Sequence, residues 1–341
     1  MKNQLSKGKI DTYSLSLKYR QASVDLENRK ILITNFQGTE QEKDFKESAN
    51  CNGFGRIRHF EISGSNSWPE NPLPIEPARK ALRLPPTSTL RAQVFQNAVC
   101  NWRCWYCYVP FDLLSANQKH SRWLSASELV ELYLKQVNPP PMIDLSGGQP
   151  DLIPEWVPWM MYELISRGLE NKVFLWSDDN LSNDYFWKYL KKSDIELIRT
   201  YKNYGRVGCF KGFDEISFSF NTMANPNLFY NQFELMKKFL SLGIDLYAYV
   251  TLTSPTDEDI DSKICSFVDK LQELDHYFPL RTIPLEIRVF TPVRSRIDNF
   301  SSKAIKNQIL AVNIWQREIK SRFSDKERSI PIYEVPVGVA C

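Results

Sequence analysis

The chain has 341 residues, of which 43% are hydrophobic and 24% are charged, and its formal net charge is +3 at pH 7. This composition predicts a folded protein with a sizeable core, and the scattered Lys and Arg residues do not indicate a nucleic-acid partner. No run of 18 or more apolar residues is present and the N-terminus lacks a signal-peptide pattern, so we expect a cytoplasmic protein with no membrane partner.

Residues 1–90 are expected to form a β-rich N-terminal extension that packs on the rest of the chain. The stretch YSLSLKYRQASVDLENRKILITNF (residues 13–36) alternates strand-like runs with turn residues. It therefore predicts a small hairpin or sheet.

A second part of the extension, NCNGFGRIRHF (residues 50–60), carries candidate substrate contacts. If it is a strand, its two-residue period places Arg56 and Arg58 on one face and His59 on the other. The arginine pair suits an anionic group, and we add Cys51 to this candidate substrate site. A solvated surface is the alternative for the arginines.

Three of the seven cysteines, Cys100, Cys104 and Cys107, lie close together in VFQNAVCNWRCWYCYVP (residues 94–110). A chance C-x3-C-x2-C arrangement is expected about 0.003 times in such a chain, so the spacing is a strong signal. The odd number of cysteines and the missing export signal argue against a disulfide framework. A strand-like segment before the cysteines predicts a strand followed by a loop, rather than a helix face that packs three thiols.

This loop favours an iron–sulfur cluster over zinc. Zinc requires a fourth Cys or His, and His120 lies far downstream with no second ligand at finger spacing. A cluster that only relays electrons takes four protein ligands, whereas three thiolates leave one iron open for reaction.

Downstream, short β-rich runs alternate with amphipathic segments. The expected strands cover residues 91–97, 142–147, 172–177, 215–220, 244–252 and 285–290. The expected helices cover residues 125–137, 154–168, 183–192, 226–243, 257–274 and 301–323. These six strand–helix units predict an α/β fold whose parallel sheet closes partly into a barrel over residues 91–323, followed by a C-terminal tail at 324–341.

Active sites of such folds lie at the carboxyl ends of the strands. The cysteine loop, SGGQP (residues 146–150) and SDDN (residues 177–180) each follow a strand and are expected to meet there. The glycine pair allows a ligand to approach the backbone closely, so we expect valine at Gly148 to weaken ligand binding and leave iron content normal.

CNWRCWYC (residues 100–107), followed by SGGQP, resembles the radical S-adenosylmethionine (SAM) superfamily, whose signature is C-x3-C-x-aromatic-C and whose second strand commonly ends in a GGEP-like turn. The resemblance implies a partial (β/α)6 barrel in which the three cysteines hold a [4Fe-4S] cluster and SAM chelates the open iron. It also implies an electron donor such as flavodoxin or ferredoxin. One electron then cleaves SAM to methionine and a 5′-deoxyadenosyl radical, which abstracts hydrogen from a substrate.

The resemblance also assigns residues to SAM. Tyr106 stands where the family places an aromatic residue near adenine, with a plain aromatic at the barrel mouth as the alternative. The turn that contacts the methionine amino group corresponds to Ser146, Gly147, Gly148, Gln149 and Pro150, with Gln149 in place of the usual Glu. The further candidates are Ser177, Asp178 and Asp179 for the ribose, Ser219 and Asn221 after the expected fourth strand in an S-x-D-G-like segment, and Phe290 and Thr291 against adenine.

Among the other cysteines, Cys209 is a candidate donor of a hydrogen atom or proton, with a structural thiol as the alternative. Cys265 and Cys341 are far apart in the sequence, so we expect no auxiliary cluster. The sequence therefore predicts a radical SAM enzyme that acts on an unidentified small molecule, nucleotide or peptide. Two alternatives stay open: a glycyl-radical enzyme activase, whose D-G-P-G-like segment is missing here, and a non-catalytic iron–sulfur sensor or scaffold.

Overall fold

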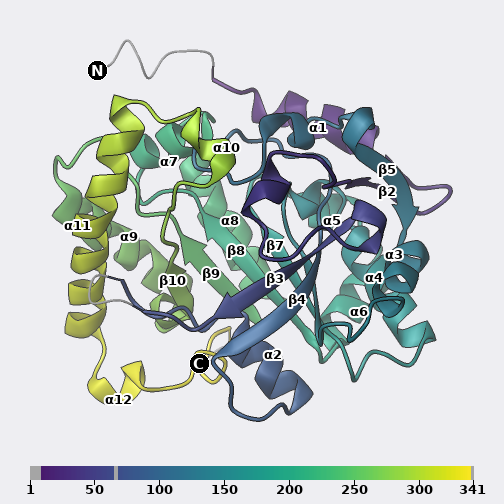
Figure 1. Cartoon of the computed structure of the whole chain (residues 1–341). Helices are drawn as coiled ribbons and strands as arrows, with labels where there is room; N and C mark the ends of the chain where they lie inside the picture. The colour runs from purple at the N-terminus through teal and green to yellow at the C-terminus, as the bar shows by residue number, and fades with distance from the viewer. Residues whose placement is uncertain (1–8, 65–67, 339–341) are drawn as a thin grey trace.

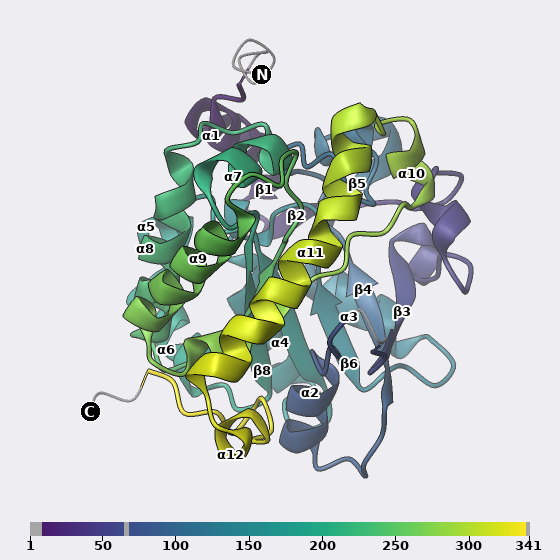
Figure 2. The ribbon, with the colours of Figure 1, turned by 90° about the vertical axis from the view of Figure 1, so that its left-hand side faces the viewer.

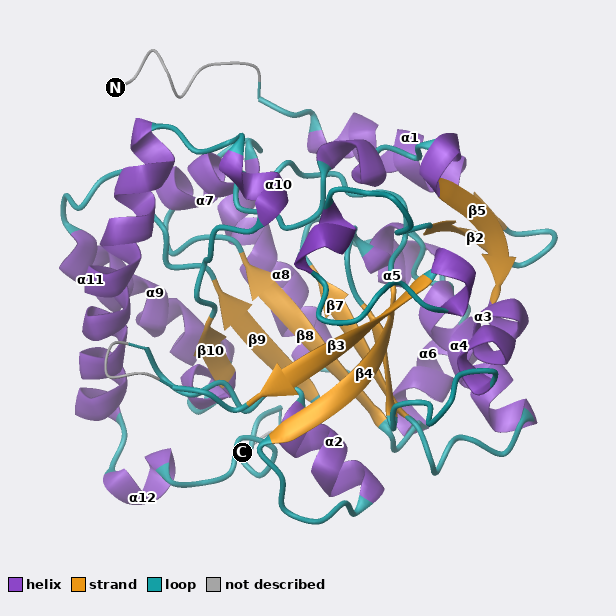
Figure 3. Cartoon of the chain, viewed as in Figure 1, coloured by secondary structure: helices purple, strands orange, loops and turns teal. Residues whose placement is uncertain are grey.

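The computed structural model describes residues 9–64 and 68–338, so Cys341 lies outside the described residues (Figure 1). A seven-stranded sheet curves into a half-barrel, and a second sheet has three strands in the order β1-β2-β5 (Figure 3). The large sheet contains β3 (Gly55–Glu61), β4 (Thr89–Phe95), β6 (Met142–Leu145), β7 (Phe174–Asp179), β8 (Tyr204–Phe210), β9 (Leu246–Val250) and β10 (Thr282–Pro284). The small sheet contains β1 (Val24–Asp25), β2 (Lys30–Thr34) and β5 (Ser121–Ser125).

The strand order in the large sheet is β10-β9-β8-β7-β6-β4-β3. The six strands from β4 to β10 are parallel, and β3 pairs antiparallel with β4 along its whole length. The predicted partial barrel of six parallel strands is therefore confirmed, and the N-terminal part of the chain adds a seventh strand to it. The predicted boundary at residue 90 stays a prediction.

Helices cover the outer, convex side of the sheet. They are α3 (Ala126–Leu134), α4 (Trp156–Ser166), α5 (Tyr185–Tyr189), α6 (Lys192–Thr200), α7 (Glu215–Thr222), α8 (Leu228–Leu240), α9 (Ile260–Leu274) and α11 (Asn299–Arg322). Figure 2 shows α9 and α11 packed side by side. Three further helices are α1 (Thr12–Ser23), α2 (Ile75–Leu82) and α10 (Thr291–Arg294), and α12 (Asp325–Arg328) follows α11. None of the helices in the described ranges has the length and apolar character needed to cross a membrane.

Alternation along the strands divides the core in two. On the convex side, residues such as Ile143, Leu175 and Phe210 pack against the helices. On the inner, concave side, a second apolar cluster joins Ala92, Met142, Phe174, Trp176, Val207 and Tyr247 to α2. The concave side is therefore filled with apolar side chains toward the amino ends of the strands.

The predicted β structure over residues 13–36 is wrong in its first half, which forms α1. Asp11 caps this helix, and its buried residues include Ser16, Arg20 and Ser23. Arg20 forms a buried ion pair with Glu155. Because this buried face is polar, hydrophobic periodicity could not reveal the helix. Only β1 and β2 form the expected hairpin.

The expected fourth strand is also wrong, because residues 215–220 belong to α7. Asp214 and Ser217 form a capping box that starts this helix. The fourth barrel strand is β8. Its sequence contains two glycines and a buried charge and therefore does not predict a strand. The expected strand 285–290 is likewise wrong, since β10 covers Thr282–Pro284 and residues 285–290 form no regular structure. The expected helix 183–192 is divided between α5 and α6.

Candidate functional site

The cysteine loop follows β4, as predicted, and has no regular helix or strand between β4 and residue 110. Cys100 is buried, and Cys104 and Cys107 are partly buried. The backbone N–H of Cys100 donates to the carbonyl oxygen of Leu114 at 3.1 Å, and Arg296 Nη1 donates to the carbonyl oxygen of Cys107 at 2.6 Å. Both ends of the cysteine cluster are thus fixed by other segments.

The three thiols share one buried environment. Burial raises the pKa of Cys104 to about 12, and burial also raises the pKa of Cys100 and Cys107. Their charges act on one another, and Lys211 counteracts the rise at all three. Burial lowers the pKa of Lys211, but Cys209 and Tyr106, followed by Cys104 and Cys100, raise it above its ordinary value. A fixed cation therefore stands beside three potential thiolate ligands. In the ranges 9–64 and 68–338, no three His, Cys, Asp or Glu side chains gather around a single-ion position.

The SGGQP turn lies directly against the start of the cysteine loop. The backbone N–H of Gln149 donates to the carbonyl oxygen of Val99 at 2.8 Å, and Asn97 Nδ2 donates to the carbonyl oxygen of Gln149 at 2.7 Å. Gly147 and Gly148 have φ of +88° and +67°, a region that favours glycine. Pro150 begins a short 3-10 turn behind them. The structure therefore brings the two predicted loops together.

Gln149 uses its side chain inside the protein. Its Nε2 donates to Asp179 Oδ1 at 2.7 Å, and its Oε1 accepts from the backbone N–H of Asn180 at 2.9 Å. Asp179 also binds Arg206 Nη2 at 2.8 Å. The side chain of Gln149 is thus occupied, so only the backbone of this turn is left to contact a ligand.

The expected ribose contacts of Asp179 and Ser177 are corrected by the same geometry. Asp179 and Ser177 are two residues apart on β7, so both side chains point to the convex side of the sheet. There the Ser177 hydroxyl lies 2.7 Å from the Tyr204 hydroxyl. Asp178 lies between them and faces the concave side. Its carboxylate accepts from Ser146 Oγ at 2.6 Å and Trp176 Nε1 at 3.1 Å. Of the three candidates, Asp178 alone lies on the concave side of the glycine turn, while Asp179 contacts Gln149 of that turn from the convex side.

Asn221 and Ser219 lie on α7 rather than at a strand end. Asn221 Oδ1 accepts from Trp105 Nε1 at 3.0 Å, and its Nδ2 donates to the carbonyl oxygen of Lys211 at 2.8 Å. Ser219 Oγ donates to the carbonyl oxygen of Ala224 at 2.8 Å and accepts from Lys9. Asn221 therefore fixes the cysteine loop against the end of β8, and Ser219 serves the α7 terminus.

Tyr106 is buried and points toward the end of β9. Its hydroxyl lies 3.1 Å from Thr251 Oγ1, immediately after that strand. Phe290 and Thr291 do not end a strand, which corrects their expected position. The backbone N–H of Thr291 donates to Asp44 Oδ2 at 2.9 Å. The rings of Phe290 and Tyr108 pack together with their centroids 6.1 Å apart. Phe290 and Thr291 thus link the C-terminal half to the N-terminal part of the chain.

Arg56 and Arg58 lie on the concave face of β3. Arg56 is opposite Val94, and Arg58 is opposite Ala92, which belongs to the inner cluster. Arg58 Nη1 lies 3.6 Å from Asp144 Oδ2, and Arg56 Nη2 donates to the Tyr108 hydroxyl at 3.1 Å. The alternation of the sequence thus gives the correct face for both arginines.

The two cysteines predicted near the site differ in position. Cys209 is paired with Tyr249 in the register and belongs to the inner cluster, and burial raises the pKa of Cys209 to about 12. Cys51 belongs to the outer cluster instead, so it does not share a face with Arg56 and Arg58. Its place in the candidate substrate site is corrected.

Sequence reasoning missed Lys211 and Asp144. Lys211 follows β8 in Cys209-Phe210-Lys211-Gly212, which has the S-x-D-G spacing with Cys for Ser and Lys for Asp. This motif lies at the end of β8, which the β-rich runs of the sequence do not reveal as a strand. Asp144 lies within the apolar run of β6, and only the register places it beside Arg58.

The family model of the radical SAM superfamily matches residues 97–264. This range includes the three cysteines, the glycine turn and Lys211. The chain contains a radical SAM domain over these residues. Enzymes of this superfamily use a [4Fe-4S] cluster and SAM.

Solved structures with a similar arrangement include SuiB of Streptococcus suis bound to the precursor peptide SuiA, at 17% identity and a TM-score of 0.41 over 66% of this chain. SuiB bound to S-adenosylmethionine matches at 17% identity and a TM-score of 0.39 over 65% of this chain. Both matches cover 46% of the SuiB chain, so this radical SAM protein spans about half of the SuiB length. No curated protein shows a significant sequence match.

Gly148→Val is expected to lower both the iron content and SAM binding of this radical SAM enzyme. A Cβ at Gly148 would lie 1.8 Å from Asn97 Oδ1 and 2.5 Å from the carbonyl oxygen of Val99, just before the cysteine loop. This corrects the expectation that iron content stays normal. Iron per chain after anaerobic reconstitution should fall severalfold. Gly168→Val is the matched control, because Gly168 has φ +64° and nothing within 4 Å of its Cβ position. Normal iron content together with weakened SAM binding in Gly148→Val would contradict this prediction.

Asp144→Asn is expected to stabilise the protein increasingly as pH rises. Burial, then the charge of Asp178, raises the pKa of Asp144 to about 8, although Arg58 and Arg56 act against the rise. The folded state then holds a proton that the unfolded chain has lost, so this carboxyl reduces stability as pH rises from about 4 to about 8. The variant's advantage in the free energy of unfolding should grow by up to about 4 kcal/mol between pH 5 and pH 9, as measured by urea unfolding. An advantage that does not change with pH would contradict this.

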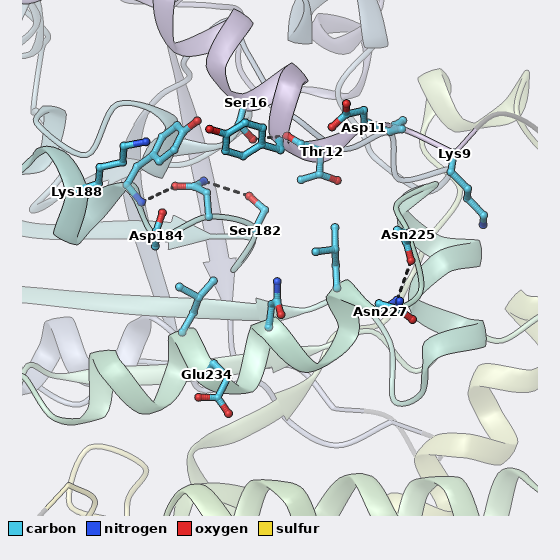
Figure 4. A pocket seen from close by; sticks show the side chains of 17 residues that line it. Lys9, Asp11, Thr12, Ser16, Ser182, Asp184, Lys188, Asn225, Asn227 and Glu234 are labelled. Atoms are coloured by element: carbon cyan, nitrogen blue, oxygen red, sulfur yellow. Dashed lines mark hydrogen bonds between the residues drawn. The ribbon is translucent and has the colours of Figure 1, made fainter.

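A separate pocket of about 700 Å³ lies outside the half-barrel. Figure 4 shows it between the start of α1, the loop after β7 and helix α8. Two of its lining residues, Ser16 and Ser182, accept hydrogen bonds from Asn101 Nδ2, each at 2.8 Å. The pocket thus borders the back of the cysteine loop, and none of the predicted site residues lines it.

Proposed function

We propose that this radical SAM enzyme holds its cluster through Cys100, Cys104 and Cys107 and abstracts hydrogen from a substrate on the concave face of the half-barrel. When bound, the cluster and SAM supply a 5′-deoxyadenosyl radical after one-electron reduction. The observation that supports the location is the register of the sheet. It places Asp144, Asp178 and Cys209 on one face, beside the loop that carries the cysteines.

The residues around the loop have distinct parts in this proposal. Lys211 offers an ammonium group beside the thiols, which suits the carboxylate of SAM and the negative charge of thiolate ligands. The backbone of Gly147 and Gly148 is free of side chains and faces the methionine moiety. Asp178, on the concave side, keeps the role of accepting hydrogen bonds from the ribose. Tyr106 packs near the adenine.

Exclusion of water is a task of the protein itself. Radical intermediates must be protected from solvent, and a half-barrel leaves one side open. Here β3 extends the sheet at the β4 edge, and Tyr108 and Phe290 pack together above it. We assign the covering of the open side to these segments. A flavodoxin or ferredoxin as electron donor and a cytoplasmic location belong to the same proposal.

The test is anaerobic reconstitution with iron and sulfide, followed by dithionite and SAM. We expect 5′-deoxyadenosine by mass spectrometry, at a rate that increases when the substrate is present. Deuterium transferred from a labelled substrate into 5′-deoxyadenosine would identify that substrate. A reconstituted protein that carries iron but forms no 5′-deoxyadenosine would overturn the proposal in favour of a sensor or scaffold.

A further inference from the structure

We infer that the concave face takes a small zwitterionic substrate of the α-amino acid class, with Asp144 binding its ammonium group and Arg58 its carboxylate. The inference rests on the proposed function, which places the substrate on this face. It adds the chemical class of the substrate and the two residues that recognise it.

Asp144 is a buried carboxyl group with open hydrogen-bonding capacity. Burial favours its protonated form, and a bound ammonium group would favour the carboxylate. Its side chain is 0% exposed, and among the described residues neither of its oxygens has a hydrogen-bond partner. Buried polar groups in proteins are nearly always paired, because an unpaired one costs free energy. Asp178, next to it on the same face, already accepts two hydrogen bonds. Asp144 is therefore the acceptor on this face that is left for a ligand.

Arg58 supplies the complementary charge. Its Nη1 lies 3.6 Å from Asp144 Oδ2, which is an ion pair but too long for a hydrogen bond. The guanidinium lies over the ring of Phe60 at 4.2 Å, and the side chain is 35% exposed. Arg58 is thus held in place by an apolar contact while its N–H groups stay available.

The side chains of β4 explain how Arg58 on β3 reaches Asp144 on β6, two strands away in the sheet. Its partner on β4 is the small residue Ala92, and the next strand carries Asp144 opposite Val94. Small side chains on β4 leave room for the long arginine to cross that strand. Asp144 also stands two residues before Ser146, so the pair lies one inward-facing position deeper than the glycine turn. This is the place for a substrate beneath SAM.

Once a bound ammonium group has converted Asp144 to the carboxylate, charge balance selects a zwitterion. A ligand with only a cation would satisfy Asp144 and leave Arg58 without a partner, and a ligand with only an anion would do the reverse. An α-amino acid carries both groups on one carbon, which matches a carboxylate and a guanidinium held 3.6 Å apart. Its remaining atoms then face Cys209 and Tyr249, which are neighbours in the register.

The test measures binding without catalysis. The reconstituted enzyme with SAM and no reductant is titrated separately with each common L-α-amino acid, using thermal unfolding and calorimetry. Each ligand that binds is compared with its N-acetyl derivative, which lacks the ammonium, and its carboxamide, which lacks the carboxylate. Asp144→Asn and Arg58→Gln are the test variants. His59→Gln is the matched control, since His59 lies on the opposite face of β3 and pairs with Glu47 at 2.7 Å.

We expect at least one amino acid to bind the wild-type protein and the His59 variant equally. Its affinity should fall at least tenfold in Asp144→Asn and in Arg58→Gln. The N-acetyl derivative should bind weakly and equally to the wild type and Asp144→Asn, and the carboxamide equally to the wild type and Arg58→Gln. Absence of binding by every amino acid, or binding that both variants retain, would overturn the inference. Formation of 5′-deoxyadenosine by the wild type tests the proposed function separately.

Discussion

Cys104→Ala is expected to abolish both the cluster and the cleavage of SAM. The wild-type protein should hold about four irons per chain after anaerobic reconstitution, and the variant close to none. The reason is that no other cysteine in the described ranges shares the loop with Cys100 and Cys107 and can replace the lost ligand. Cys100→Ala and Cys107→Ala should behave alike, with 5′-deoxyadenosine below detection in all three. Iron content and the visible absorption of the cluster are the measurements.

The controls for this prediction are cysteines outside the loop. Cys265 lies on α9, where its Sγ is 3.2 Å from Arg322 Nη2, and Cys51 belongs to the outer core. Cys265→Ser and Cys51→Ala should keep the iron content and SAM cleavage of the wild type. Cys209→Ala should also keep its iron, since Cys209 lies on β8 and not in the loop. A full cluster that still cleaves SAM after loss of Cys104 would refute the assignment.

The cysteine loop and the sheet were accessible from sequence because both are encoded locally. The spacing of the three cysteines is a property of eight residues, and four of the six barrel strands overlap apolar runs that predict strands. The failure at β8 has a physical cause. Its Arg206 binds Asp151 and lies over Phe239 of α8. Its Gly208 lies against Met236 of α8, and its Gly205 lies against Trp176 of β7. This packing, rather than β propensity, makes it a strand.

The site is harder to predict, because a shift of one residue along a strand changes the side of the sheet to which a side chain points. Asp178 and Asp179 are equivalent in a motif, yet they point to opposite sides of the sheet. In the same way, Gln149 matches the family turn in sequence, and its buried hydrogen bond to Asp179 becomes visible only in three dimensions. Asp144 and Arg58 are far apart in sequence and meet only through the pairing of β3 with β4.

The buried ion cluster behind the glycine turn leads to the second large prediction. Arg206 is 1% exposed, binds both Asp151 and Asp179, and lies over the ring of Phe239 at 4.0 Å. Burial, opposed by Arg206, raises the pKa of Asp151 to about 7. Because Asp179 also holds Gln149, the cluster connects the stability of the sheet to the position of the SAM turn.

Arg206→Met is therefore expected to cost about 3–5 kcal/mol of unfolding free energy at pH 8, because it leaves two carboxylates buried without a cation. Without Arg206 the pKa of Asp151 rises further in the folded state, which then retains a proton that the unfolded chain loses. The loss of stability should consequently be smaller at pH 5 than at pH 8. Urea unfolding at the two pH values measures it, and SAM affinity should fall as well. Adding Asp151→Asn and Asp179→Asn to the Arg206→Met variant should recover part of the stability at pH 8, since the uncompensated charges are then gone. A loss equal at both pH values and not recovered by the asparagines would show that Arg206 acts through packing against Phe239 instead of through its charge.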